Sequence, residues 1–104
     1  MNEMPAYQVI LNIVANDPTD SGELDATAEA VLEGVLRDTA FVALGPVVSV
    51  DHAQGVIELE CTISSESSED VHEKMARITH AMLEAANSFE YQGSTAKKLE
   101  PALV

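Results

Sequence analysis

Apolar and polar residues alternate along several stretches of the chain, which is the pattern of β-strands that bury one face. Residues 7–15 carry an apolar side chain at every second position, and Ile10 and Val14 in the other set are apolar as well. Residues 57–64 alternate more strictly, with apolar and polar side chains on opposite faces. Because these two stretches are the most apolar of the predicted strands, we expect them at the centre of a sheet.

Two further strands are predicted. Residues 41–50 form one of them, and the pair Gly45-Pro46 within it should interrupt or bulge the strand. Phe89 and Tyr91 alternate with polar neighbours in a last strand near the C-terminal end. Residues 94–104 then follow either as a loose tail or as an edge strand guarded by lysines.

Between the strands, two stretches repeat their apolar residues every three or four positions, as amphipathic helices do. The first covers about 23–37, and Asp20 with Glu23 has the spacing of a capping box. The second covers about 69–86, where a serine of the preceding loop can be the N-cap and Asn87 a left-handed C-terminal cap. The predicted apolar face of the first helix consists of Leu24, Ala28, Val31, Leu32, Val35 and Leu36.

The predicted elements follow the order β-α-β-β-α-β. Right-handed crossovers then produce an α+β, ferredoxin-like sandwich, in which a four-stranded antiparallel sheet carries two helices on one face. With 104 residues, the chain fits a single domain of this kind, 1–104. Since both helices cover the same face, the other face of the sheet should be open.

The charge of the chain limits its partners. Eighteen acidic residues oppose five basic ones, the formal net charge is −13, and no Lys or Arg precedes Arg37. Such a field repels phosphate, so we expect no nucleic acid and no anionic membrane as a partner. The acidic surface fits either simple solubility or a basic protein partner.

The apolar run 9–15 is too short to span a bilayer and follows no basic leader, which predicts a cytoplasmic protein.

No pattern in the chain indicates a catalytic centre, a cofactor or a metal site. The single cysteine, Cys61, falls on the apolar face of a predicted strand, where a thiol stays protonated. Glu69 and His72 have a Glu-x-x-His spacing, but the second such motif of a di-metal helical bundle is missing from the chain. Glu58 and Glu60 should face solvent, where both carboxylates stay ionised. We therefore expect a binding protein without a cofactor rather than an enzyme.

The open sheet face is the first candidate interaction surface. Its central strands should present Ile10 and Val14 beside Glu58 and Glu60. A mixed apolar and acidic face either packs on a second copy, forming a homodimer, or stays solvated. RNA-binding domains of the same topology carry stacking aromatics and basic residues on this face, and the two glutamates argue against that use.

The second candidate is the turn between the first strand and the first helix, at Asp17, Asp20, Ser21 and Gly22. It leads into a helix N-terminus, where backbone N–H groups can meet a ligand. With a longer spacing, Asp17-Pro18 and residues 22–24 resemble the Asp-x-Pro-Gly-Leu turn of ACT domains, which share this topology. The resemblance implies a regulatory domain that senses a small molecule. The chain is also similar in length to dimeric ferredoxin-like oxygenases, but no residue in it marks their chemistry.

Overall fold

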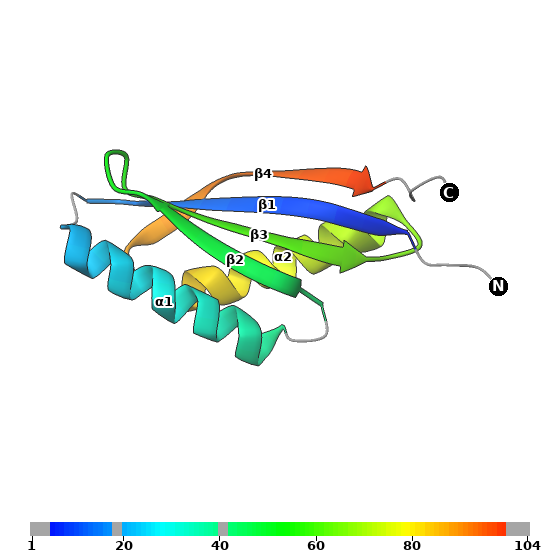
Figure 1. Ribbon diagram of the computed structural model, residues 1–104, viewed down its shortest axis with the longest axis horizontal. Coiled ribbons are helices and arrows are strands. Elements are labelled where there is room, and N and C mark those ends of the chain that lie inside the picture. The colour runs from blue at the N-terminus through cyan, green and yellow to red at the C-terminus, as the bar shows by residue number, and fades with distance from the viewer. Residues whose placement is uncertain (1–4, 18–19, 40–41, 100–104) are drawn as a thin grey trace.

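The computed structural model describes residues 5–17, 20–39 and 42–99. The elements along the chain are β1 (Ala6–Ala15), α1 (Ser21–Asp38), β2 (Leu44–Asp51), β3 (Val56–Ser64), α2 (Ser68–Ala85) and β4 (Phe89–Leu99). The strands form one antiparallel sheet in the order β2-β3-β1-β4, and both helices lie on the same face of it (Figure 1). The predicted ferredoxin-like fold is therefore confirmed, with the two most apolar strands at its centre.

The register between the central strands β1 and β3 places their apolar side chains together. On the face under the helices, three pairs of residues lie directly opposite one another: Val9 and Cys61, Leu11 and Leu59, and Ile13 and Ile57. All of these side chains are buried. The strict alternation along residues 57–64 therefore separates the core face of β3 from its other face correctly.

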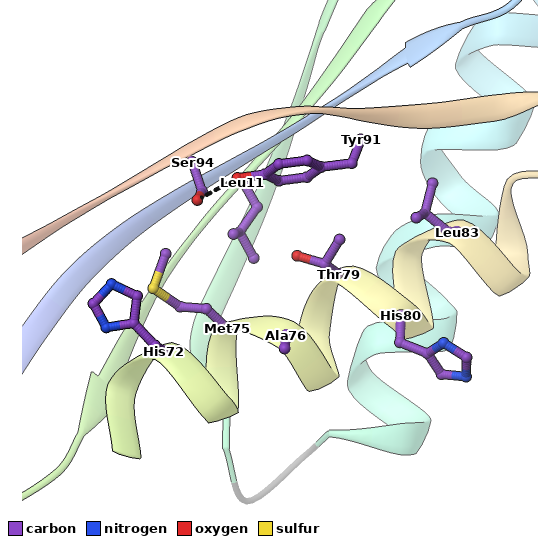
Figure 2. A pocket seen from close by; sticks show the side chains of 9 residues that line it. All are labelled: Leu11, His72, Met75, Ala76, Thr79, His80, Leu83, Tyr91 and Ser94. Atoms are coloured by element: carbon purple, nitrogen blue, oxygen red, sulfur yellow. Dashed lines mark hydrogen bonds between the residues drawn. The ribbon is translucent and has the colours of Figure 1, made fainter. Parts of the chain in front are cut away.

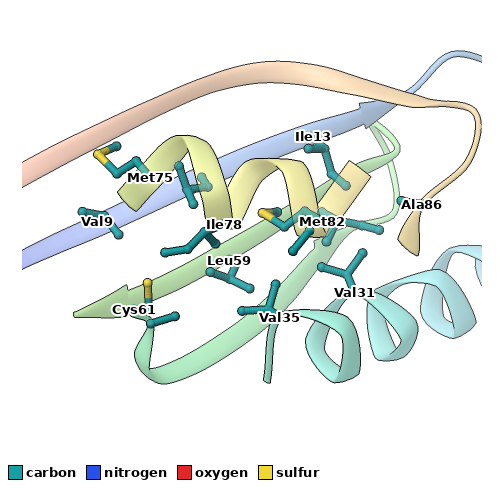
Figure 3. Packing of buried hydrophobic residues seen from close by; sticks show 14 of the residues in the cluster. Val9, Ile13, Val31, Val35, Leu59, Cys61, Met75, Ile78, Met82 and Ala86 are labelled. Carbon is teal, nitrogen blue, oxygen red and sulfur yellow. The ribbon is translucent and has the colours of Figure 1, made fainter. Parts of the chain in front are cut away.

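The hydrophobic core fills the space between this sheet face and the two helices (Figure 3). Val31 and Val35 enter it from α1, and Ile78 and Met82 enter it from α2, and all are fully buried. The helices approach each other at Gly34, where an added Cβ atom would lie 3.3 Å from a side-chain carbon of α2. Glycine at this position thus allows the two helices to pack closely. In the described part of the chain, neither helix is apolar enough along its length to cross a membrane.

Two local predictions about the helices are wrong. Leu36, which the pattern places on the buried face of α1, is 48% exposed. It lies about 100° around the helix from the buried Val35, at the margin of the apolar stripe. The left-handed residue after α2 is Ser88, with φ of 71°, and not Asn87. The Ser88 carbonyl accepts a hydrogen bond from the Asn16 N–H at 2.8 Å, a tertiary contact that cap chemistry alone does not reveal.

A bulge shapes the edge strand β2. Its pairing with β3 shifts register between Leu44 and Val47, and Gly45 has a left-handed φ of 59°. Such a backbone conformation is readily adopted only by glycine, so the bulge forms at this residue. The irregularity predicted at Gly45-Pro46 is confirmed.

The other edge strand, β4, pairs with β1 over Phe89–Leu99, and its register shifts opposite Asn12 and Ile13. Residues 94–99 of the predicted tail thus belong to an edge strand. Residues 100–104 lie outside the described part of the chain, as do residues 18–19 of the predicted ligand turn and residues 40–41.

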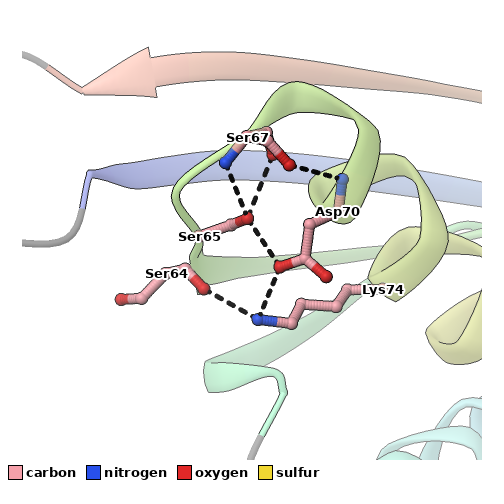
Figure 4. Close-up of polar contacts among 5 residues, drawn as sticks. All are labelled: Ser64, Ser65, Ser67, Asp70 and Lys74. Carbon is pink, nitrogen blue, oxygen red and sulfur yellow. Dashed lines mark hydrogen bonds and ion pairs between the residues drawn. The ribbon is translucent and has the colours of Figure 1, made fainter.

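A cluster of polar contacts stabilises the start of α2 (Figure 4). Ser67 is the N-cap, as the serine-rich loop predicts, and its Oγ accepts a hydrogen bond from the Asp70 N–H at 3.1 Å. The Ser65 hydroxyl donates to Asp70 Oδ2 at 2.6 Å, and Lys74 Nζ lies 3.0 Å from the same oxygen. These contacts, the hydroxyl above all, hold the pKa of Asp70 below its ordinary value. Their stabilising effect is present above the ordinary pKa of an aspartate and is lost as the pH falls through the lowered one.

Candidate functional site

On the sheet face opposite the helices, the strand register aligns side chains in rows across β4, β1, β3 and β2. We call this set of residues the open face. Its rows are Lys97-Gln8-Thr62-Leu44, Thr95-Ile10-Glu60-Val47, Gly93-Asn12-Glu58-Ser49 and Glu90-Val14-Val56-Asp51. Ile10, Val14, Glu58 and Glu60, the residues predicted for an interface, all lie in its two central columns.

The open face carries more apolar surface than the sequence pattern predicts. Besides the two expected aliphatic residues, it includes Val56, Leu44 and Val47, of which the last two are 46% and 63% exposed. Leu44 and Val47 are three positions apart, so a regular strand would point them to opposite faces. The bulge at Gly45 brings both to the open face, which is why alternation alone does not find this edge.

Neighbouring side chains provide hydrogen bonds to the two central glutamates of the open face. Gln8 Nε2 donates to Glu60 Oε1, and Ser49 Oγ donates to Glu58 Oε2 at 3.3 Å. Asn12 lies beside Glu58 in the register, and its buried Oδ1 accepts no hydrogen bond from any described residue. A buried oxygen of this kind destabilises the fold unless a donor from outside the chain reaches it.

The predicted ligand turn is organised around a helix cap. Asp20 is the N-cap of α1, and its Oδ1 accepts a hydrogen bond from the Glu23 N–H at 2.9 Å. Ser21 and Gly22 are exposed in the first turn of α1, and Asp17 is exposed after the end of β1. The Asp20 carboxylate thus occupies the helix end at which an anionic ligand would bind.

A groove that no sequence pattern predicts runs between α2 and β4 (Figure 2). Its volume is about 450 Å³. Small residues on both walls, such as Ala76 and Ser94, are the signal that the sequence contains. That signal identifies no groove until α2 is placed against β4. The residues of these two elements that line it include Met75, Ala76, Thr79, Leu83, Tyr91 and Ser94, and two histidines of α2, His72 and His80, lie at its margins.

The side chains that could take part in chemistry are buried or make hydrogen bonds within the fold. Cys61 is 3% exposed, and burial, with a smaller effect of the Glu60 carboxylate, raises the pKa of its thiol to about 11. A thiol with this pKa is a poor nucleophile at neutral pH. His72 Nδ1 lies 2.7 Å from the Ser68 carbonyl oxygen, within the first turn of α2. Among residues 5–17, 20–39 and 42–99, no three His, Cys, Asp or Glu side chains are grouped so that they could hold a metal ion.

Comparison with known proteins supports the fold. No protein-family model matches the chain, and no curated protein matches its sequence. Among solved structures, a proposed antibiotic biosynthesis monooxygenase from Chloroflexus aurantiacus has a TM-score of 0.57 and 16% identity, covering 95% of this chain and 97% of that one. A de novo designed protein with a ferredoxin fold has a TM-score of 0.51 and 16% identity, covering 97% of this chain and 88% of that one. At such low identity, the likeness shows the fold alone.

Proposed function

We propose that the chain is a non-catalytic assembly module that pairs with a second copy of itself through the open face. The observation that carries the proposal is the pair of aliphatic groups on a sheet face that neither α1 nor α2 covers. Val14 lies directly opposite Val56, and Leu44 and Val47 are neighbours along β2, so the open face carries two small apolar groups with a polar row between them. Grouped apolar side chains on an exposed face mark interaction surfaces, whereas isolated ones are ordinary.

The size of the open face suits a homodimer. Four strands about 4.8 Å apart, each about eight residues long at about 3.4 Å per residue, make a face of about 500 Å² before side-chain relief is added. A stable interface buries about 800 Å² of accessible surface on each partner. A partner must therefore cover nearly the whole face. A second copy does so through two-fold symmetry, since the same surface then meets itself.

Charge opposes this pairing in a way that can be measured. The open face carries Asp51, Glu58, Glu60 and Glu90 against Lys97, and the formal net charge of the chain is −13. Two copies repel one another, so added salt should strengthen the homodimer by screening that repulsion. A complex with a basic protein, the alternative that the acidic composition allows, should weaken with salt.

The test is the dimer dissociation constant of Val47→Arg, measured by sedimentation equilibrium beside the parent chain at low and high salt. Val47 is 63% exposed, so the substitution spares the core. Leu36→Arg is the matched control, because Leu36 is a 48% exposed aliphatic residue of α1 and the change in charge is the same. We expect Val47→Arg to raise the dissociation constant by about a hundredfold and Leu36→Arg to change it by less than about threefold.

Two results would overturn the proposal. One is a parent chain that stays monomeric at millimolar concentration in high salt. The other is a dimer whose dissociation constant is the same in Val47→Arg and Leu36→Arg. A monomer that binds a basic protein more weakly as salt is added would move the function from the open face to the acidic surface.

A further inference from the structure

The groove between α2 and β4 is a second candidate surface, on the helix side of the sheet (Figure 2). We propose that it binds a neutral, largely apolar small molecule that carries an aromatic ring and a hydroxyl or carbonyl oxygen. Its volume of about 450 Å³ is within the range of about 300–1,000 Å³ that small-molecule sites occupy. Because the groove and the open face lie on opposite sides of the sheet, this proposal does not depend on self-association.

The groove exists because small side chains meet where larger ones would complete the packing. Ala76 and Thr79 of α2 and Ser94 of β4 line it, and none of them reaches across it (Figure 2). Leu11 also lines the groove and is only 1% exposed, so the groove extends down to the core layer of β1. Because the groove is open to solvent, a ligand that replaces water in it gains dispersion contacts with the side chains next to the core.

The walls of the groove favour an aromatic ligand. The ring of Tyr91 extends from β4 along one side, while Met75 and Leu83 lie on α2 at the other side (Figure 2). Tyrosine rings attract other rings in offset or edge-to-face contacts. The polarizable sulfur of methionine also makes favourable contacts with aromatic rings. An aromatic molecule therefore gains contacts here that an alkyl chain of the same volume does not.

Polar groups of the groove can position one oxygen of the ligand. The hydroxyl groups of Tyr91 and Ser94 lie 2.7 Å apart and share one hydrogen bond, which leaves the other hydroxyl proton for a ligand oxygen (Figure 2). His72 lies at one end of the groove with Nδ1 2.7 Å from the Ser68 carbonyl oxygen. When the ring is neutral, this contact places the proton on Nδ1 and leaves Nε2 to accept a hydrogen bond from a ligand hydroxyl.

The charge around the groove selects a neutral ligand. None of the described residues that line it is a lysine, arginine, aspartate or glutamate. An anion would approach against the field of a chain whose formal net charge is −13. A cation would lose water and find no carboxylate in the lining to replace it. A neutral molecule avoids both costs.

The test uses two fluorescent probes with one skeleton: phenylnaphthylamine, which is neutral, and anilinonaphthalene sulfonate, which adds a negative charge. Affinity for the full chain is measured by fluorescence titration, and the position of the probe by NMR of the methionine methyl groups. Met75 lines the groove, whereas Met82 is fully buried in the core. Ala76→Phe fills the groove. Ala26→Phe is its matched control, because both alanines are exposed on helices.

We expect the neutral probe to bind with a Kd on the order of 100 µM and to shift the Met75 methyl signal. Ala76→Phe should weaken it at least about tenfold, with Ala26→Phe unchanged. The sulfonate should bind at least about tenfold more weakly than the neutral probe. The site is refuted by a lack of saturable binding, by equal affinity in the two variants, or by signals that shift only away from Met75. Equal affinity for both probes refutes the selection of a neutral ligand.

Sedimentation of Ala76→Phe completes the test. We expect the oligomeric state of this variant to equal that of the parent chain, because the substitution lies on the helix side. The outcome for the groove can thus be separated from the outcome for the open face.

Discussion

The two faces of the central strands β1 and β3 arise from the same alternation of side chains, but they lie in different environments. On the helix side, Leu59 is fully buried in a core of aliphatic and sulfur-containing side chains. One residue further along β3, Glu60 is half-buried among carboxylates, hydroxyl groups and aliphatic side chains. The comparison shows that strand periodicity decides which side chains share a face. The position of the helices decides which of the two faces becomes the core.

The largest expected difference between the faces is in the free energy of unfolding. Leu59→Ala should lower it by about 2–5 kcal/mol, because the substitution removes buried methyl groups and leaves a cavity. Glu60→Ala, on the open face, should change it by less than about 1 kcal/mol. Both are measured by urea unfolding at several protein concentrations, so that any contribution of association appears as a dependence on concentration.

Equal losses for Leu59→Ala and Glu60→Ala would contradict the assignment of the two faces. They would mean that Glu60 is as deeply packed in solution as the core residue beside it. A large loss for Glu60→Ala that appears only at high protein concentration would instead place Glu60 in an interface.

A further difference between the faces is expected at alkaline pH, where the buried thiol of Cys61 on the helix side loses its proton. The pKa of Cys61 is raised from 9.0 to about 11 by burial, so the unfolded chain releases this proton first. The stability that depends on the neutral thiol is complete below about pH 9 and is lost as the pH rises towards 11, a loss of roughly 2–3 kcal/mol. Unfolding of the parent chain and of Cys61→Ala is compared from pH 8 to 11. If the free energy of unfolding falls equally in the two proteins, the loss does not come from Cys61.

The smallest expected effect is at Asn12, on the open face of a central strand. Its Oδ1 is buried without a hydrogen bond from any described residue, so Asn12→Val should raise the free energy of unfolding by up to about 1 kcal/mol. The measurement is made in the Val47→Arg background by urea unfolding. A loss of stability would show that the Asn12 amide makes a compensating contact. In the chain with Val47 intact, weaker dimerisation of Asn12→Val would indicate that a second copy supplies the missing donor.

Local sequence patterns predicted much of the open face and little of the groove. Ile10, Val14 and the two central glutamates were found because they occupy regular strands, where side chains alternate strictly. Leu44 and Val47 were missed because a left-handed Gly45 reverses the alternation between them. The cap at Asp20 was predicted from its spacing to Glu23, since a helix cap is a contact between near neighbours in the chain.

Local patterns along the chain predict the order of the elements, the two central strands and most of the residues that face the core, with Leu36 as an exception. These features follow from periodicity and cap chemistry within a few residues of chain. Only the tertiary structure decided where α2 lies against β4 and therefore that a groove opens between them. It alone decided that the two edges of the open face carry Leu44, Val47 and Lys97. The physical reason is that the spacing between packed layers depends on side chains far apart in the sequence, and no local pattern records how they meet.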